Sequence, residues 1–139
     1  MLSEPDLNEI SAIESLRKSL KESRTVIPFL ELGAGSKRAG TIGQPEGGGN
    51  AFPRKINEII NTSVTPGYGK LLFLFSRFFK PGVMLELGTS LGISTAYLAK
   101  GNPGGTIYTI EGNRASAGIA SENFKKLGLD NISVLCGPF

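Results

Sequence analysis

Histidine is absent from this chain of 139 residues, and cysteine occurs once, at position 136. Without histidine, the chain offers no imidazole as a general base and cannot complete a Ser-His-Asp triad from its own residues. A single cysteine cannot form a disulfide within the chain. Because Cys136 ends an apolar, strand-like run, we expect its thiol to be buried and unreactive.

A large charge excess and long apolar runs are also missing. Lys and Arg number 15 against 12 Asp and Glu, so the net charge of +3 is too small to indicate nucleic-acid binding. No apolar run approaches the ~20 residues that a membrane-spanning helix needs, and the N-terminus is acidic rather than a basic leader. The composition therefore predicts a soluble, cytoplasmic protein that binds neither nucleic acid nor membrane.

The second half of the chain contains the pattern of a βαβ unit. The apolar run Val83–Leu87 is followed by a glycine turn at 88–92 and a helical segment at 93–100. A second apolar run, 106–110, then ends at Glu111. Because buried parallel strands read as continuous apolar runs, this order predicts two parallel strands joined by a helix.

The turn between the first strand and the helix is the place where such a unit holds a ligand. Free N–H groups at the start of the helix favour negative charge, and Gly88 and Gly92 let a ligand approach the backbone closely. Glu111, at the end of the neighbouring strand, is placed to accept hydrogen bonds from both hydroxyls of a ribose. These features predict a cofactor that contains a nucleoside.

The spacing of the glycines indicates which class of cofactor. A dinucleotide fingerprint needs glycine at the first, third and sixth positions of the turn, where this chain has Gly88, Ser90 and Ile93. Glu86, Gly88 and Gly92 instead form E-x-G-x-x-x-G, which resembles the first motif of class I S-adenosylmethionine-dependent methyltransferases. The longer string L-E-L-G-T-S-L-G-I-S-T resembles their small-molecule O-methyltransferase branch, and the resemblance covers about residues 70–139.

The resemblance implies an S-adenosylmethionine site built from the two strands, the turn and the strand that follows. Glu86 and Gly88 would lie beside the amino-acid end of the cofactor, Ser94 would bind its carboxylate, and Glu111 would bind the ribose hydroxyls. The backbone at Gly137 would border the adenine. The full set of implied cofactor residues is Glu86, Gly88, Thr89, Ser90, Gly92, Ser94, Glu111, Gly112 and Gly137.

Helical spacing is visible in three other segments. Ser3 is a predicted N-cap for an amphipathic helix whose apolar stripe comprises Leu7, Ile10, Ile13, Leu16 and Leu20. A short helix is predicted over 54–61 and a strongly apolar one over 68–79, whose apolar side chains we expect to pack on the sheet, with an acceptor pocket as the alternative. Asn113 is a predicted cap for a helix through Leu127 that stops at Gly128.

The remaining segments are predicted strands and loops. The segment 25–32 reads as a short strand, in which Pro28 favours an edge position, and Ile132–Cys136 reads as a third parallel strand. The sequence E-L-G-A-G-S at 31–36 resembles the later glycine turn, but no helix and no acid-ended strand follow it. We therefore expect the Gly-rich loop 33–50 to be a connector, with a lid or an anion-binding nest as alternatives.

These elements predict one α/β domain over 1–139, with a partial Rossmann-like parallel sheet of about three strands. Residues 1–82 would form a helical N-terminal extension, and 83–139 the cofactor-binding βαβαβ half. A complete methyltransferase sheet has further strands, so we expect this chain to be an N-terminal portion. The edge of Val83–Leu87 would then need a cover, either the segment 25–32 or a second copy of the chain.

Two other functions compete with methyl transfer to a small-molecule acceptor. The sequence Gly88-Thr89-Ser90-Leu91-Gly92 matches the G-x-S-x-G elbow of serine hydrolases, but the required histidine is absent. Alternatively, the chain is a non-catalytic, self-associating module that binds cofactor weakly or not at all. In either case we assign no catalytic base and no metal ligand to these residues, and we expect a homo-oligomer.

Overall fold

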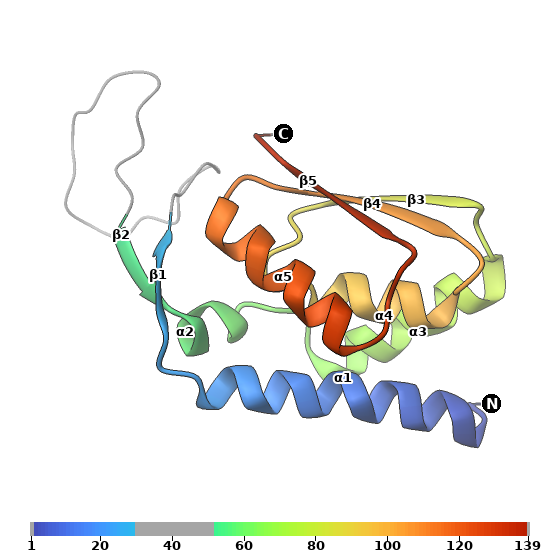
Figure 1. Ribbon diagram of the computed structural model, residues 1–139. Helices are drawn as coiled ribbons and strands as arrows, with labels where there is room; N and C mark the ends of the chain where they lie inside the picture. The colour runs from blue at the N-terminus through green and yellow to red at the C-terminus, as the bar shows by residue number, and fades with distance from the viewer. Residues whose placement is uncertain (1, 30–51, 139) are drawn as a thin grey trace.

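The computed structural model describes residues 2–29 and 52–138, and its C-terminal half is a parallel sheet of three strands in the order β3-β4-β5 (Figure 1). These strands are β3 (Val83–Leu87), β4 (Thr106–Glu111) and β5 (Ile132–Cys136). The connecting helices are α4 (Ile93–Gly101) and α5 (Arg114–Lys126). The α/β class, the partial Rossmann-like sheet and the predicted positions of its strands are therefore confirmed.

The N-terminal half is a set of helices with a two-stranded antiparallel ribbon. It comprises α1 (Glu4–Glu22), β1 (Val26–Phe29), β2 (Phe52–Lys55), α2 (Ile56–Ile60) and α3 (Pro66–Phe79). The helix predicted over 54–61 was too long, because Phe52–Lys55 pairs with β1 and the helix begins only at Ile56. Pro28 and Pro53 face each other in this ribbon, where neither can donate to the ladder. The Gly-rich loop predicted over 33–50 and the E-L-G-A-G-S segment lie outside the described residues.

The free edge of β3 is not covered by the segment that was expected there. Val26–Phe29 pairs with β2, and the ribbon lies beside the start of α5, where Asn113 Nδ2 donates to the Pro28 carbonyl at 3.3 Å. Within residues 2–29 and 52–138, β3 pairs only with β4. The prediction that 25–32 covers this edge was therefore wrong, which leaves a second copy as the remaining expected cover.

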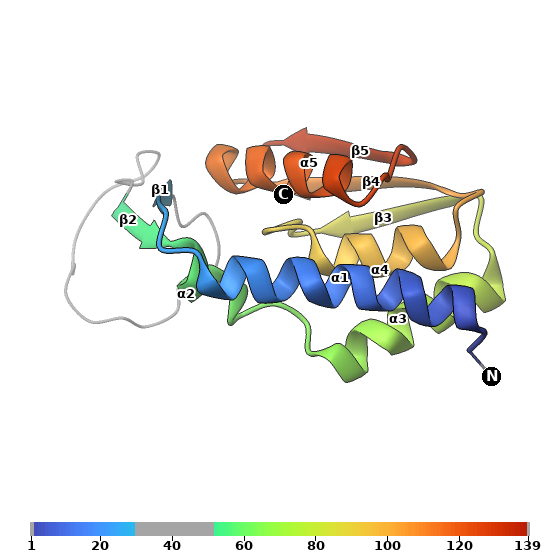
Figure 2. The ribbon, with the colours of Figure 1, turned by 60° about the horizontal axis from the view of Figure 1, so that its bottom comes forward.

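All the helices around the sheet lie on one of its faces, so within residues 2–29 and 52–138 the other face is bare (Figures 1 and 2). The bare face presents Val83, Leu85 and Leu87 of β3, which are 66%, 66% and 58% exposed, together with exposed Tyr108 and Leu135. Cys136 is also exposed, contrary to our expectation of a buried thiol. The apolar sequences of the three parallel strands predicted burial on both faces, but in the described residues the strands are covered on one face only.

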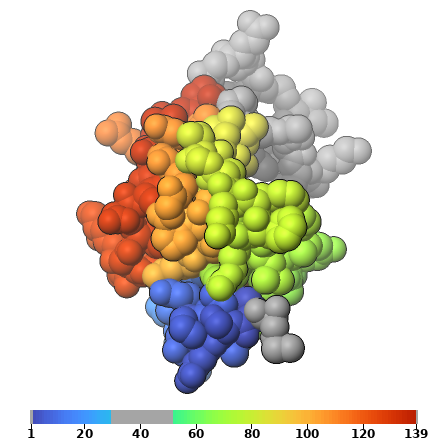
Figure 3. Space-filling view, turned by 90° about the vertical axis from the view of Figure 1, so that its right-hand side faces the viewer, coloured from blue at the N-terminus to red at the C-terminus, as the bar shows by residue number. Residues whose placement is uncertain are grey.

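Helix α3 packs on α4 rather than on the sheet. Gly69, Phe73 and Ser76 form its buried side, and Ser76 Oγ donates to the Leu98 carbonyl at 2.7 Å. The side chains expected in a helix-on-sheet core lie at the surface instead, namely Leu71, Leu74, Phe75, Phe78 and Phe79. Figure 3 shows the surface of α3 in yellow-green, continuous with the start of β3.

Helix α1 closes the helical layer through apolar and polar contacts. Its capping box at Ser3 and Asp6 is formed as predicted, and Ile10, Ile13 and Leu20 are buried, whereas Leu7 is half exposed. Tyr97 of α4 donates to the Glu14 carboxylate at 2.5 Å, and the pKa of this phenol is raised by burial and then by Glu14. Over the described residues, no helix is long and apolar enough to cross a bilayer.

The contact between α3 and α4 depends on a glycine that has no space for a side chain. A Cβ at Gly101 would lie 2.3 Å from the carbonyl oxygen of Phe73, which is backbone and cannot rotate away. Gly118, in the exposed part of α5, has nothing within 4 Å of the same position and serves as the matched control. The two glycines thus differ in packing but not in the type of element that holds them.

We expect Gly101→Ala to lower the free energy of unfolding by about 1–3 kcal/mol, because the added carbon forces α3 and α4 apart. Gly118→Ala should raise it by about 0.5–1 kcal/mol, because alanine favours the helix. Urea unfolding followed by circular dichroism measures both. Equal effects at the two positions would contradict the close packing of α3 on α4.

Candidate functional site

The predicted ligand-binding turn leaves β3 with three left-handed residues. Gly88, Ser90 and Gly92 have φ values of 91°, 50° and 86°. The N–H groups of Gly88 and Thr89 both donate to the Ile110 carbonyl, at 2.9 and 3.2 Å, so the turn is fastened to the end of β4. Gly92 cannot carry a side chain, since a Cβ there would lie 2.5 Å from the Phe124 ring. The left-handed backbone therefore favours glycine at 88 and 92, and packing against Phe124 requires it at 92.

Glu111 lies against this turn at the end of β4. Its Oε2 accepts the Ser90 N–H at 2.7 Å, and its Oε1 accepts the Asn113 N–H at 2.8 Å. In an α/β hydrolase, a strained backbone at the position of Ser90 exposes the nucleophile. Ser90 has such a left-handed backbone, but here its N–H donates to Glu111. A carboxylate has about four acceptor positions, so two remain for other donors.

Glu86 and Ser94 contact each other directly. Ser94 Oγ, in the first turn of α4, donates to Glu86 Oε1 at 2.6 Å. Thr109 of β4 donates to Oε2 at 2.7 Å, and Thr95 donates to the same oxygen. The helix-facing side chain of Glu86 thus joins β3, α4 and β4.

The structure brings the predicted cofactor residues to one end of the sheet. Glu86, Gly88, Thr89, Ser90, Gly92 and Ser94 lie along the end of β3, the turn and the start of α4, while Glu111 and Gly112 follow β4. Gly137 follows β5, and its N–H donates to the Glu111 carbonyl at 3.0 Å. Carboxyl ends of parallel strands are the usual ligand site of such sheets. That these residues bind a cofactor stays a prediction.

Sequence analysis missed Thr95 and Thr109, both of which are fully buried. Thr109 is a polar residue in the interior of β4, between Tyr108 and Ile110, and Thr95 directly follows a predicted site residue. A hydroxyl that is buried among apolar side chains needs a hydrogen-bond partner, and this need was the signal that could have identified the two threonines. Asn123 was also missed, and its Nδ2 donates to the Leu91 carbonyl at 2.9 Å, which ties α5 to the turn.

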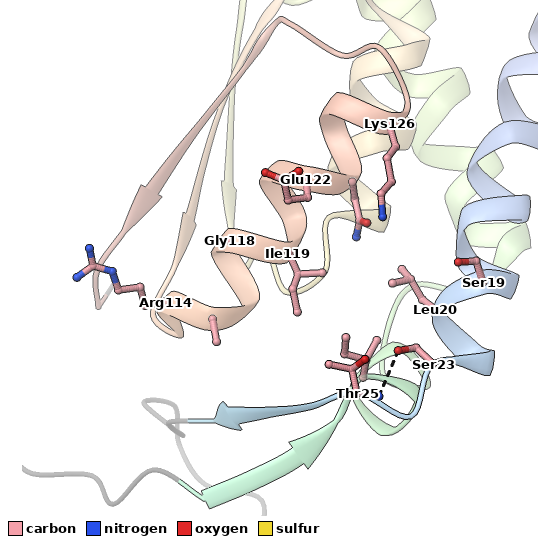
Figure 4. A pocket seen from close by; sticks show the side chains of 12 residues that line it. Ser19, Leu20, Ser23, Thr25, Arg114, Gly118, Ile119, Glu122 and Lys126 are labelled. Atoms are coloured by element: carbon pink, nitrogen blue, oxygen red, sulfur yellow. Dashed lines mark hydrogen bonds between the residues drawn. The ribbon is translucent and has the colours of Figure 1, made fainter.

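A separate groove of about 500 Å³ lies between the end of α1 and one side of α5 (Figure 4). Its lining includes Ser19, Ser23, Arg114, Glu122 and Lys126. None of the predicted cofactor residues lines it. Among residues 2–29 and 52–138, no group of three or more His, Cys, Asp or Glu side chains is placed to hold a metal ion.

The fold and the turn define the class to which this chain is similar. A parallel sheet with an E-x-G-x-x-x-G turn after its first strand and an acid after its second is the Rossmann-like arrangement of the S-adenosylmethionine-dependent methyltransferases. No family model matches the chain. Individual proteins do match it.

Two of these are catechol O-methyltransferases. The one from Mycobacterium tuberculosis is 34% identical over 83 residues, which are 58% of this chain and 38% of that protein. The one from Niastella koreensis is 37% identical over 68 residues, which are 48% of this chain and 31% of that protein. The chain thus spans about a third of the length of the curated relatives that it matches.

A solved structure gives the same result. The O-methyltransferase TomG from Streptomyces achromogenes, in complex with S-adenosylmethionine, is 32% identical with a TM-score of 0.52 over 54% of this chain and 34% of that one. These comparisons confirm the resemblance to S-adenosylmethionine-dependent O-methyltransferases that the motif indicated.

The contact of Glu111 with the turn can be tested without any ligand. In Glu111→Gln, one of the two backbone N–H groups would face an amide NH₂ instead of an acceptor. We expect the loss of a hydrogen bond to a charged group, worth about 1.5–3 kcal/mol, to speed amide exchange at Ser90 or Asn113 about 10- to 100-fold. Hydrogen exchange measured by NMR gives these rates.

The amide of Ala96, which donates to the Gly92 carbonyl inside α4, is the internal control. The matched variant is Glu122→Gln, because Glu122 is exposed and pairs with Lys125 on α5. Unchanged exchange at both Ser90 and Asn113 in Glu111→Gln would show that Glu111 does not hold the turn.

Proposed function

We propose that this chain forms the cofactor-binding half of an S-adenosylmethionine-dependent methyltransferase that acts on a small-molecule acceptor. The observation that carries the proposal is the carboxylate of Glu111 hydrogen-bonded to the turn at Ser90, beside the start of α4. The names of the relatives and the ligand of TomG support the choice of cofactor.

The residues present fit the cofactor by their chemistry. Both oxygens of Glu111 keep an unused acceptor position, which matches the two hydroxyls of a ribose. Ser94 supplies a hydroxyl at the start of a helix, where a carboxylate is favoured. Gly88, Gly112 and Gly137 let a ligand approach the backbone without meeting side chains, and Gly137 is the expected neighbour of the adenine.

The chain's contribution to methyl transfer would be binding and orientation. S-adenosylmethionine supplies a methyl group that its sulfonium already activates, so the protein must mainly align cofactor and acceptor. Removal of a proton from a hydroxyl acceptor needs a base, and this chain contains no histidine for that task. We therefore assign the base and the contacts with the acceptor to none of the described residues.

Binding of S-adenosylhomocysteine and of its 2′-deoxyribose analogue tests this function. Calorimetry should show that the wild-type chain binds S-adenosylhomocysteine and prefers it to the analogue. Glu111→Ala should bind S-adenosylhomocysteine about 10- to 100-fold more weakly, since two hydrogen bonds of about 1 kcal/mol each are lost. In this variant the preference between the two compounds should disappear.

Glu122→Ala, which removes an exposed carboxylate that pairs with Lys125, should bind both compounds like the wild type. No binding of S-adenosylhomocysteine by the wild-type chain would reject the proposed function for this chain. A preference for the ribose that survives in Glu111→Ala would place the ribose elsewhere.

The second candidate is a self-associating module, which the bare sheet face favours. In register, this face carries Val83, Leu85, Leu87, Thr106, Tyr108, Ile110, Ser133 and Leu135, none of which is charged. A contact between identical subunits requires a self-complementary patch, and an uncharged apolar patch meets its copy without repulsion. The edge of β3, which pairs with no further strand among the described residues, borders the same face, so a second copy is the cover that we propose.

Leu85→Lys would put a charge on this face in the middle of β3 and should shift the chain from a dimer or larger assembly to a monomer. Sedimentation equilibrium over a range of concentrations measures the change. Asn8→Lys adds the same charge at an exposed position of α1 and should leave association unchanged. A wild-type chain that is monomeric at every concentration would refute self-association.

A further inference from the structure

The carboxylate of Glu86 is surrounded by hydroxyl groups from three parts of the fold. Ser94 donates to Oε1 at 2.6 Å, while Thr109 donates to Oε2 at 2.7 Å together with Thr95. A fourth hydroxyl, that of Thr89 in the turn, lies 2.6 Å from Thr109 Oγ1. The four hydroxyls come from the turn, the first part of α4 and the middle of β4.

The directions of these hydrogen bonds follow from proton counting. A hydroxyl has one proton, and that of Thr109 is given to Glu86. In the contact between Thr89 and Thr109, Thr89 must therefore be the donor. The result is a chain of hydrogen bonds from Thr89 through Thr109 to Oε2 of Glu86.

The two oxygens of Glu86 are held in different ways. Thr89, Thr95 and Thr109 are at most 1% exposed, so water cannot replace the hydroxyls that hold Oε2. Ser94, the partner of Oε1, is partly exposed and lies where the turn meets α4. Oε2 is thus bonded by buried hydroxyls alone, whereas Oε1 is bonded by the hydroxyl of a partly exposed residue.

We infer that Thr95 and Thr109 are positioning residues that fix Glu86 so that Oε1 receives the ammonium group of an amino-acid ligand. The inference rests on the proposed function and deepens it, because it assigns how the amino-acid end is selected. When such a ligand binds, the Ser94 hydroxyl turns from Oε1 to the ligand carboxylate, and the ammonium takes its place on Oε1. Without the hydrogen bonds to Oε2, the carboxylate rotates and Oε1 is no longer placed to accept the ammonium group.

The test compares S-adenosylhomocysteine with 5′-methylthioadenosine, which keeps the nucleoside and the thioether but lacks the amino-acid end. Thr95→Val removes one donor to Oε2 while keeping the shape of the side chain. By calorimetry, this variant should bind S-adenosylhomocysteine about tenfold more weakly, as the loss of one such hydrogen bond implies. Its affinity for 5′-methylthioadenosine should stay within about twofold, since nothing at the nucleoside end depends on Oε2.

Two further variants separate positioning from a general loss of structure. Thr95→Ser keeps the hydroxyl and should restore the wild-type preference for S-adenosylhomocysteine. Thr106→Val makes the same change on β4, on the sheet face turned away from Glu86, and should alter neither affinity. Where Thr95→Val does not fold, Thr109→Val removes the other buried donor from a strand, in which valine is favoured. Because this change also leaves the Thr89 hydroxyl without its acceptor, both affinities should fall, but that for S-adenosylhomocysteine should fall about tenfold further.

The outcomes distinguish the inference from the proposed function. If the wild-type chain binds neither compound, the proposed function itself fails. If it binds both, and the valine variants weaken both equally or weaken neither, the threonines do not position Glu86 and the inference is overturned. A selective loss of S-adenosylhomocysteine that serine reverses supports it.

Discussion

The hydrogen bonding of the Glu86 carboxylate is the constraint around which the βαβ unit is arranged. A carboxylate between a strand and a helix is costly unless its oxygens are bonded, and here hydroxyls of α4 and β4 supply those bonds. The bonds form only if α4 returns over the sheet beside β3 and β4 pairs in the observed register, with Glu86 opposite Thr109. One polar residue thus ties together the crossover and the strand register.

The distribution of helices has an equally direct consequence for the surface. With α1, α3, α4 and α5 on one side of the sheet, the main cluster of buried side chains lies among the helices, the turn before α4 and β1, and none of its members belongs to β3, β4 or β5. Parallel sheets are normally covered on both faces, because their strands are apolar on both sides. In the described residues this requirement is met on one face only, which makes association the natural way to remove the other face from water.

The sequence predicted the elements well where local signals agreed with each other. The caps at Ser3 and Asn113, the stop at Gly128 and the apolar runs of the three parallel strands all correspond to observed features. These signals work because they describe interactions between residues that are near in the chain. The juxtaposition of Glu111 with the glycine turn was also predictable, since parallel strands bring their carboxyl ends together.

The errors concern which partner covers a side chain, which local patterns do not contain. The apolar spacing of α3 indicated a buried helix, but it could not show that α4 would meet only the side of Gly69, Phe73 and Ser76. The pairing of Phe52–Lys55 with β1 depends on a partner distant in the chain and was missed, and the exposure of Cys136 depends on an uncovered sheet face. The hydroxyls of Thr95 and Thr109 became informative only once the fold placed them around Glu86.

In the cofactor site that we propose, Glu111 and Glu86 are held in place before any ligand binds. Each uses part of its acceptor capacity within the protein, Glu111 on two backbone N–H groups and Glu86 on three hydroxyls. Such bonds remove the rotamer freedom that binding would otherwise have to remove, so less affinity is lost to ordering. For Glu111 they also couple structure to the proposed binding, because a substitution that frees this carboxylate changes the turn at Ser90 as well. Substitutions that keep the shape of the side chains around these carboxylates, such as threonine to valine, therefore reveal more about binding than removal of the carboxylates themselves.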